Sequence, residues 1–206
     1  TAIANSSLSF LDLQITPDSG NLDLLIDWEL EAFAEAKNSL GEIDQDFDFS
    51  SFGGSVAADA AVTWASGHGD ADAPDFFPPD LSVSATASSD VNLPGCDLKW
   101  ANSLGRGSLI NGFSISGGTG SVNVDFSANL MGALEVLTDE CGKLAQTEVI
   151  FTFEIFDLLP LSGGILQDQM LWSFRESLQV GANAHQNLLV SESLSTSRLL
   201  NFDTEY

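Results

Sequence analysis

Apolar and polar residues alternate along much of this chain, most clearly from Leu22 to Lys37. The apolar residues that share one parity in this segment are Leu24, Ile26, Trp28, Leu30, Ala32, Ala34 and Ala36. Acidic residues fill most of the other parity. A two-residue period is typical of a β-strand with one face in a core and one in water. The pattern predicts one long strand with an acidic outer face. If the protein polymerises, like charges on that face favour an interior position in the sheet.

A second alternating segment, Ser7 to Thr16, changes phase along its length. Leu8 and Phe10 share one parity, and Leu11, Leu13 and Ile15 share the other. Such a change is what a β-bulge produces, because one extra residue reverses the faces of the strand. We therefore predict a bulged strand here.

Further alternating segments follow, separated by turns rich in Gly, Pro, Asn and Asp. They lie at 55–66, 81–88, 108–116, 122–130, 147–156, 172–180, 187–194 and 198–202. No segment predicts a helix with confidence, and no fixed repeat period is present. About nine or ten strands of this kind predict an all-β fold, a two-sheet antiparallel β-sandwich of the jelly-roll or Greek-key type. We expect residues 1–206 to form a single domain.

Two irregular segments interrupt the pattern. Residues 67–80 contain three prolines and two glycines, which predicts an exposed loop. Residues 89–107, which include Cys96 and Trp100, read as a second long connection.

The charge balance narrows the classes of partner. Thirty acidic residues stand against six basic ones, for a formal net charge of -24. Such a chain cannot neutralise a phosphate backbone, so nucleic acid is an unsuitable partner, and an anionic membrane surface is equally unfavourable. No apolar run approaches the roughly 20 residues of a membrane span. The balance suits a soluble surface or the binding of cations.

Cys96 and Cys141 are the two cysteines. Their spacing does not fit a zinc site, and two cysteines in a chain rich in Gly, Ser and Asp favour a disulfide in an oxidising compartment. Closing a loop of this length would stabilise the fold by about 4 kcal/mol in the chain-entropy model. The alternative is two unpaired buried thiols.

Two acidic clusters are candidate calcium ligands, and no other cofactor is expected. Asp44, Asp46 and Asp48 have the spacing of a calcium loop, although Phe49 replaces its glycine. The other cluster, in the proline-rich segment, consists of Asp70, Asp72 and Asp75. A loop can surround calcium with carboxylates and carbonyls without a motif.

No catalytic constellation is visible, so we expect no enzyme. The chain lacks a G-x-S-x-G elbow and a Cys-His arrangement. The segment from Glu42 to Asp46 partly resembles the strand motif of a jelly-roll glycoside hydrolase family, in which two glutamates act as nucleophile and acid. Here Asp46 stands in place of the second glutamate and the spacing is one residue short. A solvated acidic strand is the simpler interpretation.

The N-terminal segment suggests a route to self-assembly. Residues 1–7 are polar and lead directly into an apolar strand, so we expect them to extend from the domain. A free strand can be donated to a neighbouring subunit with an open sheet edge. The residues that would form this assembly strand are Leu8, Phe10, Leu11, Leu13 and Ile15. A frayed terminus is the alternative.

The chain also resembles two groups of exported β proteins. Acidic, lysine-poor strands of Ala, Ser and Asp are similar to those of bacterial or archaeal exosortase-sorted surface proteins, and Ser191 to Tyr206 resembles the region before their last strand. The predicted architecture is similar to that of jelly-roll matrix-fibre subunits, which polymerise through donated strands. Either resemblance implies an extracellular structural role. The chain starts at Thr1 without Met, so we expect a signal peptide to have been removed.

These observations lead to two hypotheses. The first is a secreted structural subunit that forms an extracellular filament or matrix with copies of itself by strand donation. The alternative is a secreted β-sandwich module that binds a carbohydrate or calcium, with Trp100 as the aromatic residue available for a glycan.

Overall fold

The computed structural model of the chain describes residues 1–24, 29–51, 54–73, 82–91, 99–110, 112–139, 144–156 and 168–206. The described residues form thirteen strands and no helix, and every paired strand is antiparallel. The prediction of an all-β fold is confirmed. None of the described residues form a helix of the length and apolarity that a membrane span requires.

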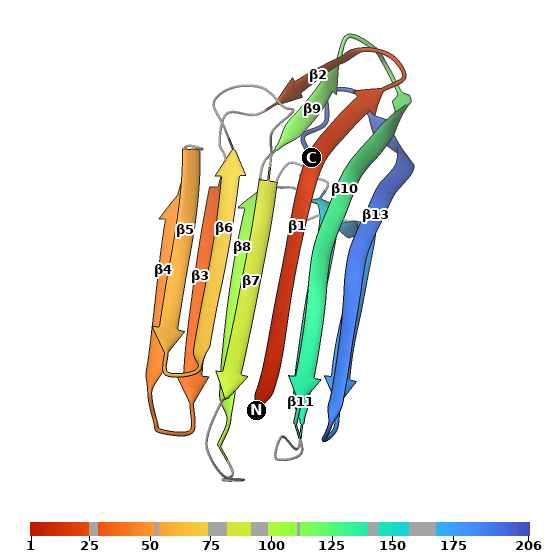
Figure 1. Cartoon of the computed structure of the whole chain (residues 1–206). Helices are drawn as coiled ribbons and strands as arrows, with labels where there is room; N and C mark the ends of the chain where they lie inside the picture. Colours follow the sequence, from red (N-terminus) through yellow and green to blue (C-terminus); the bar gives the residue numbers. More distant parts are fainter. Residues whose placement is uncertain are drawn as a thin grey trace.

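The largest sheet has six strands (Figure 1). In spatial order they are β13 (Ala184–Asn201), β10 (Ser121–Thr138), β1 (Ala2–Pro17), β7 (Ser82–Val91), β6 (Ala65–Ala73) and β5 (Gly54–Val62).

Smaller sheets complete the structure. Three strands pair in the order β4 (Ile43–Ser50), β3 (Glu29–Asn38) and β8 (Ala101–Ile110). They contact β5, β6 and β7 and lie behind them in Figure 1. Strand β11 (Ala145–Phe156) pairs with β12 (Asp168–Val180), and this pair contacts β1, β10 and β13. Strands β2 (Asn21–Leu24) and β9 (Phe113–Ser116) pair near one end of the molecule. The chain is thus built as two layers.

The predicted bulge in β1 is confirmed. The pairing of β1 with β10 shifts register between Leu11 and Gln14, and Asp12 adopts a φ of 58°, in the left-handed region. Leu8 and Phe10 are buried before the shift and Leu13 after it. The extra residue keeps apolar side chains facing the second layer on both sides of the bulge.

The long strand predicted from Leu22 to Lys37 is divided. Its first part is β2, which pairs with β9, and its last part is β3, which pairs with β4 and β8. Residues 25–28 lie outside the described residues. The predicted parity holds in β3, whose buried apolar residues are Leu30, Ala32, Ala34 and Ala36. Strand β3 is the interior strand of its sheet.

Both predicted connections contain strands, which is one reason that the structure has more strands than predicted. Residues 65–73 form β6, between β5 and β7, and residues 101–107 belong to β8. The glycines and prolines of residues 67–80 predict a break in the sheet. In the structure, however, Gly67 and Gly69 occupy ladder positions opposite Ala60 and Ala58. The reason is packing: these glycines face β8 at close range.

The close approach of β6 and β8 depends on four glycines. A Cβ atom at Gly67 or Gly69 would lie less than 3.0 Å from backbone oxygens of β8, and one at Gly105 or Gly107 less than 3.0 Å from backbone oxygens of β6. Around this contact the core is mostly alanine, with Ala32, Ala34, Ala36, Ala58, Ala60, Ala65 and Ala71 all buried. This side of the molecule is therefore thin.

The other side is filled by large side chains. Phe10 of β1 stacks on Phe151 and Phe153 of β11 with ring centroids 4.8 and 5.9 Å apart, and Trp172 of β12 lies 5.1 Å from Phe153. Phe126 of β10 is almost fully buried in the same region. Aromatic residues bury large areas and hold the layers further apart than alanine can.

We expect Gly105→Ala to destabilise the protein by about 3 kcal/mol or more, at the upper end of overpacking costs, because its Cβ would meet backbone oxygens of His68 and Thr86. Gly181→Ala is the matched control, since nothing lies within 4 Å of a Cβ there. Urea unfolding of the two variants measures the difference. Similar midpoints for both would contradict the close packing of β6 on β8.

Candidate functional site

A row of carboxylates joins the edges of the two layers. Strand β4 supplies Asp44, Asp46 and Asp48, and Glu42 precedes it. Their side-chain oxygens accept hydrogen bonds from backbone N–H groups of the β5 edge: Ala61 to Asp44 (2.9 Å), Asp59 to Asp46 (3.0 Å), Ala57 to Asp48 (3.3 Å) and Thr63 to Glu42 (3.0 Å). We call these four residues the carboxylate seam.

Two members of the seam use both of their oxygens as acceptors. Asp46 accepts the N–H of Phe47 on Oδ1 (3.0 Å), and Asp48 accepts the N–H of Phe49 in the same way (2.9 Å). In the described part of the chain, β4 pairs only with β3 and β5 only with β6, so each strand is a sheet edge. The seam satisfies edge donors that would otherwise be open to another strand.

The seam gives a structural role to residues considered for calcium or glycoside hydrolysis. Asp44, Asp46 and Asp48 extend along a strand, and their oxygens receive N–H donors. Asp70 accepts the hydroxyl of Ser84 on the neighbouring strand, and Asp72 lies two residues further along β6. Asp75 lies outside the described residues. Within the described ranges, no group of three or more His, Cys, Asp or Glu side chains could hold a metal ion.

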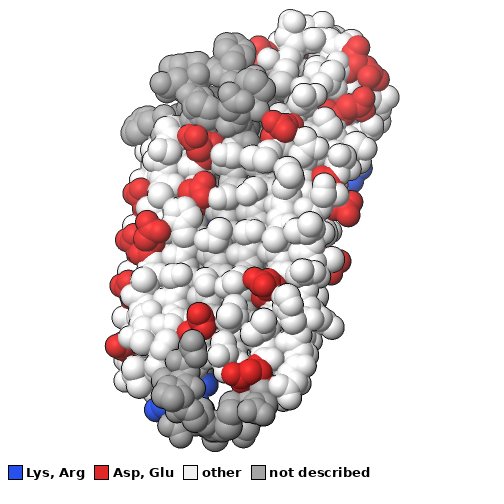
Figure 2. Space-filling model, viewed as in Figure 1, with Lys and Arg blue, Asp and Glu red and all other residues white. Residues whose placement is uncertain are grey.

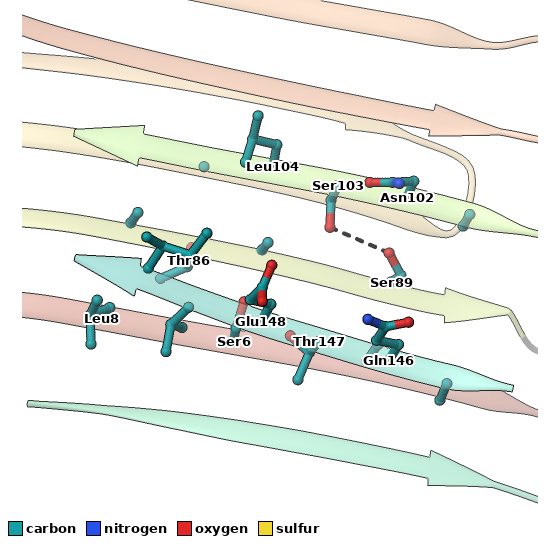
Figure 3. A pocket seen from close by; sticks show the side chains of 18 of the residues that line it. Ser6, Leu8, Thr86, Ser89, Asn102, Ser103, Leu104, Gln146, Thr147 and Glu148 are labelled. Carbon is teal, nitrogen blue, oxygen red and sulfur yellow. Dashed lines mark hydrogen bonds between the residues drawn. The ribbon is translucent and has the colours of Figure 1, made fainter. Parts of the chain in front are cut away.

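A cleft lies where the thin and thick sides of the molecule meet. Strand β8 pairs only with β3 and β11 only with β12 in the described residues, so each leaves one edge unpaired. These strands line a cleft of about 780 Å³, and β1 and β7 form its floor (Figure 3). A second hollow of about 310 Å³ continues between β8 and β11. The cleft is thus bounded by two sheet edges.

The floor and the rims of the cleft differ in character. Small residues of β1 and β7 form much of the floor, among them Ala4, Ser6, Ala85, Ala87 and Ser89. Ser103 of β8 points down to β7, where its hydroxyl lies 3.3 Å from that of Ser89 and donates to the carbonyl of Ser88 (Figure 3).

The rims carry exposed apolar side chains on both sides. Trp100 precedes β8 and Leu104 lies in it, and both are about half exposed. Leu144 and Ile150 occupy the β11 side, with 53% and 58% of their surface exposed. Apolar groups that gather beside an unpaired edge mark a place where another chain can bind.

The predicted assembly strand is an interior strand in the structure. Leu8, Phe10, Leu11, Leu13 and Ile15 all lie in β1. This strand pairs with β10 along its length and with β7 from Ala2 to Phe10. Residues 2–7, expected to extend freely, have partners on both sides, because their backbone completes the six-stranded sheet. Sequence reasoning missed the cleft, since only pairing reveals which edges are open.

Two further features bear on the site. Cys96 and Cys141 both lie outside the described residues, so their predicted disulfide stays a prediction.

Acidic side chains are scattered over the face shown in Figure 2, whereas Lys and Arg appear at few places. Lys99 and Arg106, two of the chain's six basic residues, line the cleft.

Comparison with protein-family models, curated proteins and solved structures found no match to this chain.

Acid should weaken the seam at Glu42. A hydrogen bond from the Asn38 amide, together with those from Thr63, lowers the pKa of the Glu42 carboxyl below its ordinary value of 4.5. A lowered folded-state pKa stabilises the protein above the ordinary value, and this stabilisation is lost as the pH falls through the folded value. Glu42→Gln should therefore lose less unfolding free energy than the wild type between pH 7 and pH 3.

Urea titrations at several pH values measure this difference. Glu192→Gln, at an exposed position of β13, is the control and should keep the wild-type acid dependence. If Glu42→Gln shows the full wild-type dependence, Glu42 does not hold the seam through its charge.

Proposed function

We propose that this chain is a secreted structural subunit that assembles with copies of itself into an extracellular filament or matrix. The joining element is an extended segment of a second copy, inserted between β8 and β11. The observation that carries the proposal is the contrast between sheet edges. The edges of β4 and β5 are closed by the seam, whereas those of β8 and β11 have no strand partner among the described residues and face one cleft.

The dimensions of the cleft support insertion of a strand. On the β11 side its lining runs from Leu144 to Phe151. Eight residues of extended chain span roughly 26 Å at about 3.3 Å each. An inserted strand would pair with two edges at once and place its outward side chains beside Leu104 and Ile150. Backbone pairing would supply affinity and the apolar rims would supply burial.

The chemistry of the cleft supports a second copy as the occupant. A strand seated on Ala85, Ala87 and Ser89 needs small side chains at alternate positions, and alanine-rich strands are common in this chain. The lining of the cleft contains two basic residues, Lys99 and Arg106, and one acidic residue, Glu148, within a chain of net charge -24. Acidic segments of another copy would meet positive charge here.

We interpret the two layers as a β-sandwich of the jelly-roll or Greek-key type. The acidic surface and a Cys96–Cys141 disulfide would suit an extracellular location after removal of a signal peptide. The role requires no catalysis.

Charging the rims should prevent assembly. We expect Leu104→Lys/Leu144→Lys to stay monomeric at concentrations at which the wild type forms higher assemblies, because insertion would desolvate two ammonium groups. Leu189→Lys/Leu199→Lys is the matched control, with the same charge change at exposed positions of β13 (81% and 66% exposed). Light scattering and negative-stain electron microscopy provide the measurement.

The control variant should assemble like the wild type. Equal assembly of both double variants would exclude the cleft as the junction. A wild type that remains monomeric at all concentrations would exclude self-assembly altogether.

A second candidate function is the binding of a carbohydrate in the same cleft. Trp100 is exposed at the rim, and Asn102, Gln146 and Glu148 supply polar groups nearby. An aromatic surface with a few polar groups is the usual composition of a small-ligand site.

Calorimetric titration with neutral oligosaccharides tests this alternative. If a sugar binds, Trp100→Ala should weaken binding at least tenfold, because the stacking surface is lost. Phe47→Ala, at an exposed aromatic residue of β4, is the control and should bind like the wild type. Absence of heat with every sugar, or equal binding by both variants, would exclude the carbohydrate hypothesis at this site.

A further inference from the structure

Strand β5 is an edge that pairs readily with another chain unless it is covered. It has nine residues, Gly54 to Val62, of which only Asp59 is charged. The rest are Gly, Ser, Ala and Val, so Asp59 is the one residue of the strand whose charge opposes edge pairing. Natural edge strands are protected by charges, prolines, bulges or a cover. Here the cover is the carboxylate seam.

We infer that β5 is a latent docking edge for the β5 strand of a second copy, and that protonation of the seam uncovers it. Two antiparallel β5 strands related by a two-fold axis would join their six-stranded sheets. A self-complementary surface of this kind closes as a dimer. This inference is independent of the cleft between β8 and β11.

The chemistry of the carboxyl group makes the seam sensitive to acid. An ionised carboxylate accepts hydrogen bonds on both oxygens, whereas a protonated one turns one oxygen into a donor. Asp46 and Asp48 each accept one N–H group on Oδ1 and another on Oδ2. Protonation places a hydrogen on one of the two accepting oxygens, which weakens the bond there, and the other bond loses its charge assistance.

The other charged groups near the seam have partners of their own. On β3, Lys37 pairs with Glu35 (2.6 Å) and Glu31 lies 3.9 Å from Arg106. On the β5 and β6 side, Nδ1 of His68 lies 2.8 Å from Asp59, and its Nε2 lies 3.2 Å from Asp70.

Seam carboxylates show no such pairing. Among the described residues, no Lys, Arg or His forms an ion pair with Glu42, Asp44, Asp46 or Asp48. The seam is therefore held by N–H donors alone.

The variant Asp46→Asn/Asp48→Asn reproduces the protonated state at pH 7, because an amide also has one acceptor oxygen. We expect hydrogen-exchange protection at the N–H groups of Ala57 and Asp59 to fall at least tenfold. We also expect the mass in solution to double, as measured by light scattering after gel filtration. The wild type should show both changes at pH 3, after correction for intrinsic exchange rates.

Asp18→Asn/Asp90→Asn is the matched control, with the same charge change at exposed positions away from the seam, and should remain as the wild type. Adding Ala57→Pro to the seam variant should restore the monomer, because proline removes the N–H group that Ala57 would donate across the joined edges. Unchanged protection in the seam variant would overturn the role of the seam. Lost protection without a doubled mass would overturn the docking edge. Should circular dichroism show the double variant to be unfolded, Asp46→Asn alone supplies the same readouts at Asp59.

Discussion

The close contact of backbone on backbone between β6 and β8 is the constraint on which the rest of the structure depends. Gly67, Gly69, Gly105 and Gly107 remove the side chains that would separate these strands. Alanine then fills the remaining space around them. Because the opposite side is packed with Phe and Trp, the second layer cannot continue smoothly from β8 to β11. The cleft lies at this change in packing, and the core therefore determines where the molecule is open.

The treatment of sheet edges follows from the same arrangement. On the thin side the layers approach so closely that short Asp side chains of β4 reach N–H groups of β5. The seam thus needs no extra strand to cover these edges. At the cleft, neither β8 nor β11 has such a partner among the described residues. Closing one pair of edges while leaving another open would direct association between copies to a defined place.

Much of the fold can be predicted from the sequence, because burial in a strand follows a two-residue period. The buried parity of β3 and the bulge near Asp12 are both predicted from apolar positions alone. Two of the errors arise where a glycine is needed for close packing between strands. Gly67 and Gly105 resemble loop residues in a local pattern, yet both lie in paired strands. A local pattern cannot separate a glycine that ends a strand from one that admits a neighbouring backbone.

The sequence by itself determined the all-β class, the inner and outer faces of strands such as β3, and the alternation of Glu42, Asp44, Asp46 and Asp48. Only the tertiary structure decided what those carboxylates do, because their hydrogen-bond donors belong to another strand in the other layer. It likewise decided that β1 is an interior strand and that β8 and β11, among the described residues, each leave an unpaired edge beside one cleft. The physical reason is that side-chain direction is a local property of the backbone, whereas the partner of each strand edge depends on contacts between distant segments.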